Sequence, residues 1–201
     1  MKSLLIATTN PAKFEEAKAA LSSENLAILG LKDFPGIVTV EETGATFEEN
    51  AILKAKGYFE QTHIPTIADD GGFAVDYLKG APGVSSHRWL GHEATDLELA
   101  NAVLEKLKGV PSDKRAARLG GFVVFYDGEH LLKQENWIEG YVAEELMGEI
   151  KPGFPYRAIL MVPQFNKSYG DLTEEEHEAV NFRRKNLREL KPKILELLNK
   201  A

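Results

Sequence analysis

Apolar residues at the start of the chain change from an unbroken run to a helical spacing. Residues 3–7 are mostly apolar, which predicts a buried strand. Asn10 follows as a candidate N-cap, and Pro11 takes the first helical position, where its missing N–H costs nothing. Apolar residues then recur on one face of the predicted helix: Phe14, Ala17 and Leu21. The pattern predicts a strand, a tight turn and a helix.

Two capping-box patterns predict further helices. Thr46 and Glu49 have the spacing of such a box and begin a helix that we expect to run to about Gln61. Thr95 and Glu98 begin another, which Gly109 and Pro111 end. Its apolar face comprises Leu97, Ala100, Val103, Leu104 and Leu107.

The remaining periodic segments predict a mixed sheet. Strands are expected over residues 64–68, 73–77, 119–126, 130–139 and 157–162, and a last helix over 180–199. Asp127-Gly128 is typical of a hairpin turn, so part of the sheet is antiparallel. The alternation predicts an α/β fold, and 201 residues fit a single domain over 1–201.

Composition narrows the class of protein. There is no cysteine, which excludes disulfides, thiolate zinc sites and a cysteine nucleophile. The net charge of −7 argues against a general nucleic-acid binder, although a few lysines can still bind one nucleotide. The N-terminal apolar run is too short for a signal peptide, and no stretch is long enough to span a membrane. We expect a soluble, cytoplasmic protein that contacts no membrane.

The first candidate for chemistry is the turn from Thr8 to Lys13. Thr8, Thr9 and Asn10 precede a helix, and helix N-termini bind phosphate through unpaired N–H groups. Lys13 lies in the first turn, where it reaches back to the same anion. The alternative is that Asn10 only caps the helix.

Two acidic segments are candidates for a divalent cation. Glu41-Glu42-Thr43-Gly44 offers carboxylates before a glycine turn, and Lys54 lies on the next helix. Asp69-Asp70-Gly71-Gly72 follows an apolar strand directly. Adjacent carboxylates at the end of a buried strand resist desolvation unless they are paired or metal-bound. The alternatives are a solvated lysine and an ordinary polar turn.

Weaker candidates lie further along the chain. Arg88 follows a stretch of small residues and is suited to pair with phosphate or a carboxylate. Phe154 and Tyr156 suit a base-stacking platform, although such rings are more often core. The run 183–185 is either a solvated face or a polar grip on a nucleotide.

Taken in order, these segments resemble the inosine triphosphate pyrophosphatases, which act on non-canonical purine nucleotides. The similarity runs from Leu4 to about Leu190. The most specific segments are Ala7-Thr8-Thr9-Asn10-Pro11-Ala12-Lys13, residues 41–55, Ala68-Asp69-Asp70-Gly71-Gly72-Phe73 and Gly80-Ala81-Pro82-Gly83-Val84 with Arg88.

The resemblance implies hydrolysis of ITP, dITP or XTP to a monophosphate and pyrophosphate, with Mg²⁺. It also implies a homodimer and an elongated mixed sheet flanked by helices, with a central cleft between two lobes. By position, the segment from Thr8 to Lys13 and Lys54 would hold the phosphates. Glu41 and Asp70 would bind the metal, Asp70 would accept the proton, and Asp69 would support them.

The chain departs from the family where the base would be recognised. The family's Phe-Gly-Tyr-Asp-Pro corresponds to 154–158, so Arg157 replaces an aspartate. Its lysine corresponds to His177, and its Ser-His-Arg to Asn181, Phe182 and Arg183. The serine of its Asp-Asp-Ser-Gly is Gly71 here.

These changes leave the base and sugar open, because discrimination depends on each donor and acceptor being met. The leading hypothesis is an active pyrophosphatase with altered base choice. The alternatives are a nucleotide-binding protein without turnover and an interaction domain.

Overall fold

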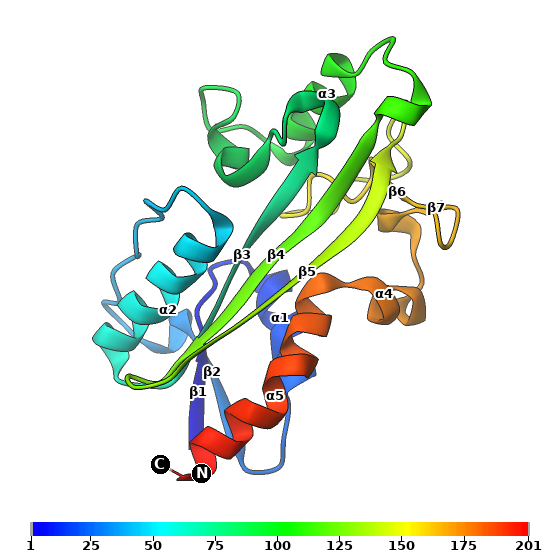
Figure 1. Cartoon of the computed structure of the whole chain (residues 1–201). Coiled ribbons are helices and arrows are strands. Elements are labelled where there is room, and N and C mark those ends of the chain that lie inside the picture. The colour runs from blue at the N-terminus through cyan, green and yellow to red at the C-terminus, as the bar shows by residue number, and fades with distance from the viewer. Residues whose placement is uncertain (1, 201) are drawn as a thin grey trace. The chain divides into compact units, whose positions relative to one another are not determined.

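The computed structural model describes residues 2–200, except for the side chains of Ser85, His87 and Arg88. The sheet has the strand order β2-β1-β3-β4-β5-β6-β7 (Figure 1). Its strands are β1 (Lys2–Ile6), β2 (Leu26–Gly30), β3 (Thr66–Val75), β4 (Ala116–Tyr126), β5 (Leu131–Val142), β6 (Leu160–Val162) and β7 (Lys167–Ser168). The α-helices are α1 (Pro11–Leu21), α2 (Phe47–Thr62), α3 (Asp96–Lys106), α4 (Glu174–Val180) and α5 (Phe182–Lys200).

The mixed sheet expected from the sequence is confirmed. β1 pairs in parallel with both β2 and β3. β6 pairs antiparallel with both β5 and β7. Within the described residues, no helix is long and apolar enough to cross a membrane.

The chain divides into two compact units, and each is described by itself. The first contains residues up to Asp70, residues 121–136 and the chain from Phe182 onward. The second contains residues 71–120 and 137–181. Helices α1, α2 and α5 therefore belong to the first unit, and α3 and α4 to the second.

In the first unit, alternate residues of β1 face two different layers of helix. Leu4 and Ile6 pack into a core with α1 and α5. Leu5 and Ala7 pack into another core with α2. Figure 1 shows α2 on one side of these strands and α5 on the other. The two-residue period of a strand accounts for the two cores.

The same alternation continues along β3 and separates the two aspartates. Ile67 belongs to the core with α1 and α5, and Ala68 to the core with α2. Asp69 therefore falls on the α1/α5 face, and Asp70 on the α2 face.

The two strands expected over 64–68 and 73–77 are a single strand, because β3 runs through residues 69–72 without a break, and the polar turn considered there is excluded. The strand has neighbours on both sides, β1 and β4. Among the described residues, β1 pairs with β3 only at Thr66 and Ile67, and the neighbour on the other edge is β4. Pairing of backbone polar groups with a neighbouring strand outweighs the preference of Asp and Gly for turns.

The predicted helix starts are confirmed where side chains cap them. The Oδ1 atom of Asn10 accepts hydrogen bonds from the backbone N–H groups of Ala12 and Lys13, at 2.9 and 3.3 Å. Complete capping boxes begin α2 at Thr46 and α3 at Thr95.

The last third of the chain differs from the predicted elements. The strand expected over 157–162 is confined to β6, after a turn in which the Ile159 N–H donates to the Tyr156 carbonyl. The helix expected over 180–199 is two helices, because Asn181 leaves the helical conformation at a ψ of 114°. The capping box of α4, formed by Thr173 and Glu176, was not anticipated.

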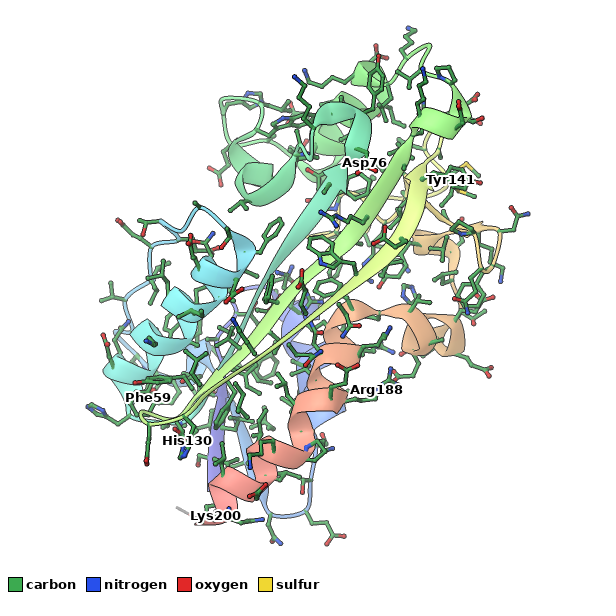
Figure 2. The ribbon with its side chains drawn as sticks, viewed as in Figure 1. Phe59, Asp76, His130, Tyr141, Arg188 and Lys200 are labelled. Atoms are coloured by element: carbon green, nitrogen blue, oxygen red, sulfur yellow. The ribbon has the colours of Figure 1, made fainter. Side chains whose placement is uncertain are left out.

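Two contacts anchor the ends of these elements within their units. Figure 2 shows Phe59 of α2 near the hairpin tip that carries His130. A Cβ atom on Gly128 of that tip would lie 2.6 Å from the Phe59 ring, so glycine is required there, at a φ of +98°. In the second unit, the buried Arg115 guanidinium donates to the carbonyls of Leu107, Val142 and Ala143 and so ties the end of α3 to the end of β5.

Candidate active site

One polar cluster lies on the α1/α5 face of the first unit, around the Asp69 carboxylate. Its Oδ2 atom accepts hydrogen bonds from Nε and Nη2 of Arg183, at 3.1 and 2.9 Å. Lys13 Nζ donates to the same oxygen at 3.2 Å. Arg183 Nη1 also donates to Glu16 Oε2 at 2.6 Å. Residues of α1, β3 and α5 thus form one ion-pair network, which we call the Asp69 cluster.

A second cluster lies on the α2 face, around the Lys54 ammonium group. Lys54 Nζ lies 3.3 Å from Asp70 Oδ1 and 3.2 Å from Glu42 Oε2. The Lys54 side chain is 12% exposed and the Asp70 side chain 13% exposed. We call this group the Asp70 cluster.

The loop that carries Glu42 is fixed to the start of α2. The Gly44 N–H donates to Oδ1 of the buried Asn50 side chain at 2.7 Å. A Cβ atom on Gly44 would lie 2.6 Å from the Glu49 Cβ and 2.7 Å from that amide oxygen. Glycine is therefore required for the loop to lie against the helix and bring Glu42 to Lys54.

The two aspartates have opposite electrostatic environments. Burial by itself raises the pKa of Asp69, but the charges of Arg183 and Lys13 outweigh it and hold that pKa well below its ordinary value. Burial raises the pKa of Asp70 to about 6, and the nearby Glu42 adds to the effect while Lys54 opposes it. Asp69 is compensated by two cations, whereas Asp70 shares the single ammonium group of Lys54 with Glu42.

The residues expected to contact the base form an aromatic and cationic cluster in the second unit. The Arg157 guanidinium carbon lies 3.5 Å from the centroid of the Phe154 ring and 5.2 Å from that of Tyr169. The Tyr169 ring meets the His177 ring edge-on, with centroids 4.7 Å apart. Arg157 is therefore held between two aromatic faces.

Tyr156 points to a different neighbour in the same unit. Its ring stacks on Phe73, with centroids 4.7 Å apart, and its hydroxyl lies 2.6 Å from the Ser86 Oγ atom. Burial raises the pKa of Tyr156 to about 12.

The structure places half of the residues proposed for phosphate and metal binding in two clusters, one on each face of β3. Lys13, Lys54, Asp69 and Asp70 all lie in the two clusters of the first unit. Thr8 accepts a hydrogen bond from the Asn10 N–H at 3.2 Å.

Other predicted residues lie apart from these clusters. Glu41 and Thr9 are exposed, and Glu42 rather than Glu41 reaches Lys54. Phe182 is buried in the first unit beside the Arg183 guanidinium, and Gly71 begins the second unit. Arg88 lies outside the described side chains. Arg183 is buried, so the solvated face considered for it is excluded.

Three members of these clusters were missed from the sequence. Glu16 lies three residues after Lys13 on the same helix, so the helical period placed it on the same face. Glu42 was considered only as the neighbour of Glu41. No sequence pattern indicated Tyr169, because no motif near it relates it to Arg157.

In the first unit, lysine side chains lie beside carboxylates on both faces of β3. Lys13 lies at the N-terminal turn of α1 and Lys54 on α2, so cationic groups stand on both faces of β3 beside a carboxylate in need of positive charge. Among the described side chains, no group of three or more His, Cys, Asp or Glu residues could hold a metal ion.

Comparison with known proteins gives a consistent result. The model of the Ham1 family matches residues 4–193. The dITP/XTP pyrophosphatase of Bacillus cereus is 40% identical over 199 residues, which cover 98% of this chain and 96% of that protein. The dITP/XTP pyrophosphatase of Escherichia coli is 40% identical over 187 residues, covering 91% of this chain and 93% of that protein.

Solved structures agree with these sequence matches. A HAM1 protein from Coxiella burnetii superposes with a TM-score of 0.83 at 31% identity, and each chain is covered completely. The Ham1 protein of Staphylococcus aureus gives a TM-score of 0.83 at 30% identity, over 97% of this chain and 98% of that one.

Proposed function

Because the chain belongs to the Ham1 family, we propose that it hydrolyses purine nucleoside triphosphates such as ITP, dITP and XTP. The products would be the nucleoside monophosphate and pyrophosphate. Relatives named dITP/XTP pyrophosphatase, aligned over nearly the whole chain, support this substrate class. The sequence resemblance supports the position of the cleaved bond.

The observation that carries the proposal is the pair of lysines on the two faces of β3. Triphosphate cleavage needs neutralisation of phosphate charge and a well-placed water more than it needs covalent chemistry. We assign Lys13 and Lys54 to the phosphates, with Thr8, Thr9 and Asn10 of the turn before α1 beside them.

We further propose that Asp70 accepts the proton of the attacking water. Burial of the Asp70 side chain, which is 13% exposed, supports this role, because a partly desolvated carboxylate is a stronger proton acceptor. Lys54, 3.3 Å from Asp70 Oδ1, would keep that carboxylate oriented.

The residues of the Asp70 cluster fit Mg²⁺. The ion binds proteins through one or two carboxylates together with substrate phosphates, so a cage of several acidic residues is not required. Asp70 offers one oxygen ligand in need of positive charge, and the pair Glu41 and Glu42 offers a second. When bound, the metal would neutralise charge on the phosphate oxygens.

The base preference is proposed to differ in detail from that of the relatives. The stack of Arg157 between Phe154 and Tyr169 supports this, because a cation stands where the family has an acceptor. Phe154, Tyr156, Arg157, His177 and Phe182 are the residues we assign to the base side, and Arg88 is assigned to a phosphate or a carboxylate.

A panel of NTPs and dNTPs, assayed for pyrophosphate release with and without Mg²⁺, tests the proposal. We expect the deaminated purine nucleotides to be turned over best, and chelation of the metal to abolish turnover. Absence of turnover with every nucleotide, together with tight binding, would favour a binding protein instead.

We also propose that the chain forms a homodimer, as the family resemblance implies. Sedimentation equilibrium at several protein concentrations should give twice the monomer mass. A monomer at all concentrations would exclude the dimer.

A further inference from the structure

Arg183 matches the arginine that the resemblance places near the base, but its guanidinium is engaged elsewhere. The residue is 3% exposed. Two of its nitrogens donate to Asp69 and the third to Glu16. We propose that Arg183 is a positioning residue, which fixes Asp69 and thereby leaves Lys13 able to bind phosphate. The inference rests on the proposed function.

The contacts form a closed ring that begins and ends on α1. Lys13 of α1 contacts Asp69 of β3, Asp69 contacts Arg183 of α5, and Arg183 contacts Glu16 of α1. A planar guanidinium can serve two carboxylates at fixed angles, which a lysine ammonium on a flexible stem cannot do as well. The ring therefore fixes the first turn of α1 relative to β3.

Within the ring, only Lys13 has a side chain open enough to meet a phosphate. It is 23% exposed, against 8% for Asp69 and 4% for Arg183. A phosphate would draw the Lys13 ammonium away from the Asp69 carboxylate. Lys13 can therefore bind a phosphate only if another cation stays beside the Asp69 carboxylate.

Arg183 supplies that compensation. If Lys13 were the sole counter-ion of the buried Asp69, its transfer to a phosphate would leave an uncompensated buried charge, which is strongly unfavourable. With the guanidinium in place on Oδ2, Asp69 stays ionised and paired when Lys13 moves. Arg183 would thus act on phosphate affinity through Lys13, whatever base the substrate carries.

Inorganic tripolyphosphate, which has no base, separates this role from base recognition. We would titrate it calorimetrically, in EDTA, into the full chain and its variants. Arg183→Lys should weaken binding by about tenfold, the loss of one charge-assisted contact. Arg188→Lys, exposed on the same helix (Figure 2), should change the affinity by less than about twofold.

A double-mutant cycle tests whether the effect passes through Lys13. In a Lys13→Met background, Arg183→Lys should cause no further loss of tripolyphosphate affinity. Arg183→Gln provides a second variant if Arg183→Lys does not fold, as judged by circular dichroism, and should lose at least as much affinity.

Nucleotide turnover gives the second readout. The ratio of kcat/KM between ITP and GTP should stay the same in Arg183→Lys, while both values fall. A changed ratio with intact tripolyphosphate affinity would show that Arg183 reads the base and would overturn the proposal. Failure of wild type to bind tripolyphosphate would also overturn it, whereas the proposed function would still be judged by pyrophosphate release from the nucleotide panel.

Discussion

At the scale of single residues, the adjacent Asp69 and Asp70 differ because the strand sends them to opposite faces. Asp69 meets two cations on the α1/α5 face. Asp70 meets only Lys54, which it shares with Glu42. The same side chain is therefore a structural ion-pair partner at one position and, at the next, the carboxylate to which we assign the proton-accepting role.

Replacing each aspartate by asparagine should separate these roles. Asp70→Asn should lower turnover by about 100-fold or more, the usual effect of losing a general base. Its free energy of unfolding should be unchanged or higher at pH 7, because burial disfavours the ionised form of Asp70.

Asp69→Asn should instead cost about 3 kcal/mol of stability, since it leaves a buried guanidinium with a weaker partner. Urea denaturation and pyrophosphate release measure the two effects. Equal losses of stability in both variants would contradict the assignment.

The raised pKa of Tyr156 predicts that the free energy of unfolding falls at alkaline pH. Its pKa is raised from 10.0 to about 12 in the folded chain, so between these values only the unfolded state has lost the proton. The contribution of Tyr156 to the free energy of unfolding is fully present below pH 10. It should be lost as the pH rises towards about 12, which lowers the free energy of unfolding by up to about 3 kcal/mol.

The comparison with Tyr156→Phe isolates this contribution from the other tyrosines. Urea denaturation at pH values from about 8 to 11 should show a shallower alkaline decline for the variant. Parallel declines for the two proteins would exclude the predicted contribution.

At the scale of elements, the beginning of α2 organises one side of the candidate site. Thr46 caps the helix, Asn50 holds the Gly44 loop, and Lys54 follows one turn later. Helix α3 begins with the same capping box at Thr95 but carries none of the proposed phosphate or metal ligands. Removing the N-cap of each helix therefore separates the effect of lost helix stability from an effect on the candidate site.

Thr46→Ala and Thr95→Ala should each cost about 1 kcal/mol of stability, the usual loss on removing an N-cap. Only Thr46→Ala should also lower kcat/KM, because the fraying helix end carries the loop that brings Glu42 to Lys54. Thermal unfolding and pyrophosphate release check this. An equal loss of kcat/KM in both variants would mean that the loss of activity follows from reduced stability alone.

At the scale of the whole molecule, the proposed functions divide between the two units. The proposed phosphate and metal ligands lie in the first unit, and the cluster of Phe154, Arg157, Tyr169 and His177 in the second.

Substitutions in the first unit should therefore affect all nucleotides alike, whereas substitutions in the second should change the preference between bases. Lys13→Met should lower kcat/KM for all nucleotides by a similar factor, about tenfold or more. Arg157→Gln should change the ratios between bases, because it removes a cation from the aromatic cluster. Steady-state kinetics on ITP, XTP, GTP and ATP measure both, and a base-dependent effect of Lys13→Met would contradict the division.

The sequence by itself determined the features whose interacting groups lie within a few residues of one another in the chain. The N-caps at Asn10, Thr46 and Thr95 were predictable because the cap and the N–H groups it satisfies are local. The alternating strands and the candidate residues Lys13, Lys54 and Asp70 were also readable, from spacing and from the family resemblance.

Only the tertiary structure decided the features that depend on distant partners. β3 continues through Asp69 and Asp70, beyond its pairing with β1 at Thr66 and Ile67 and with β4 as its other neighbour, which no local pattern reveals. Arg183 meets Asp69 across 114 residues of sequence, so only the packing of α5 beside β3 brings them together. Side-chain charges are visible in a sequence, but which charges compensate one another depends on the faces to which the pleat and the helices direct them.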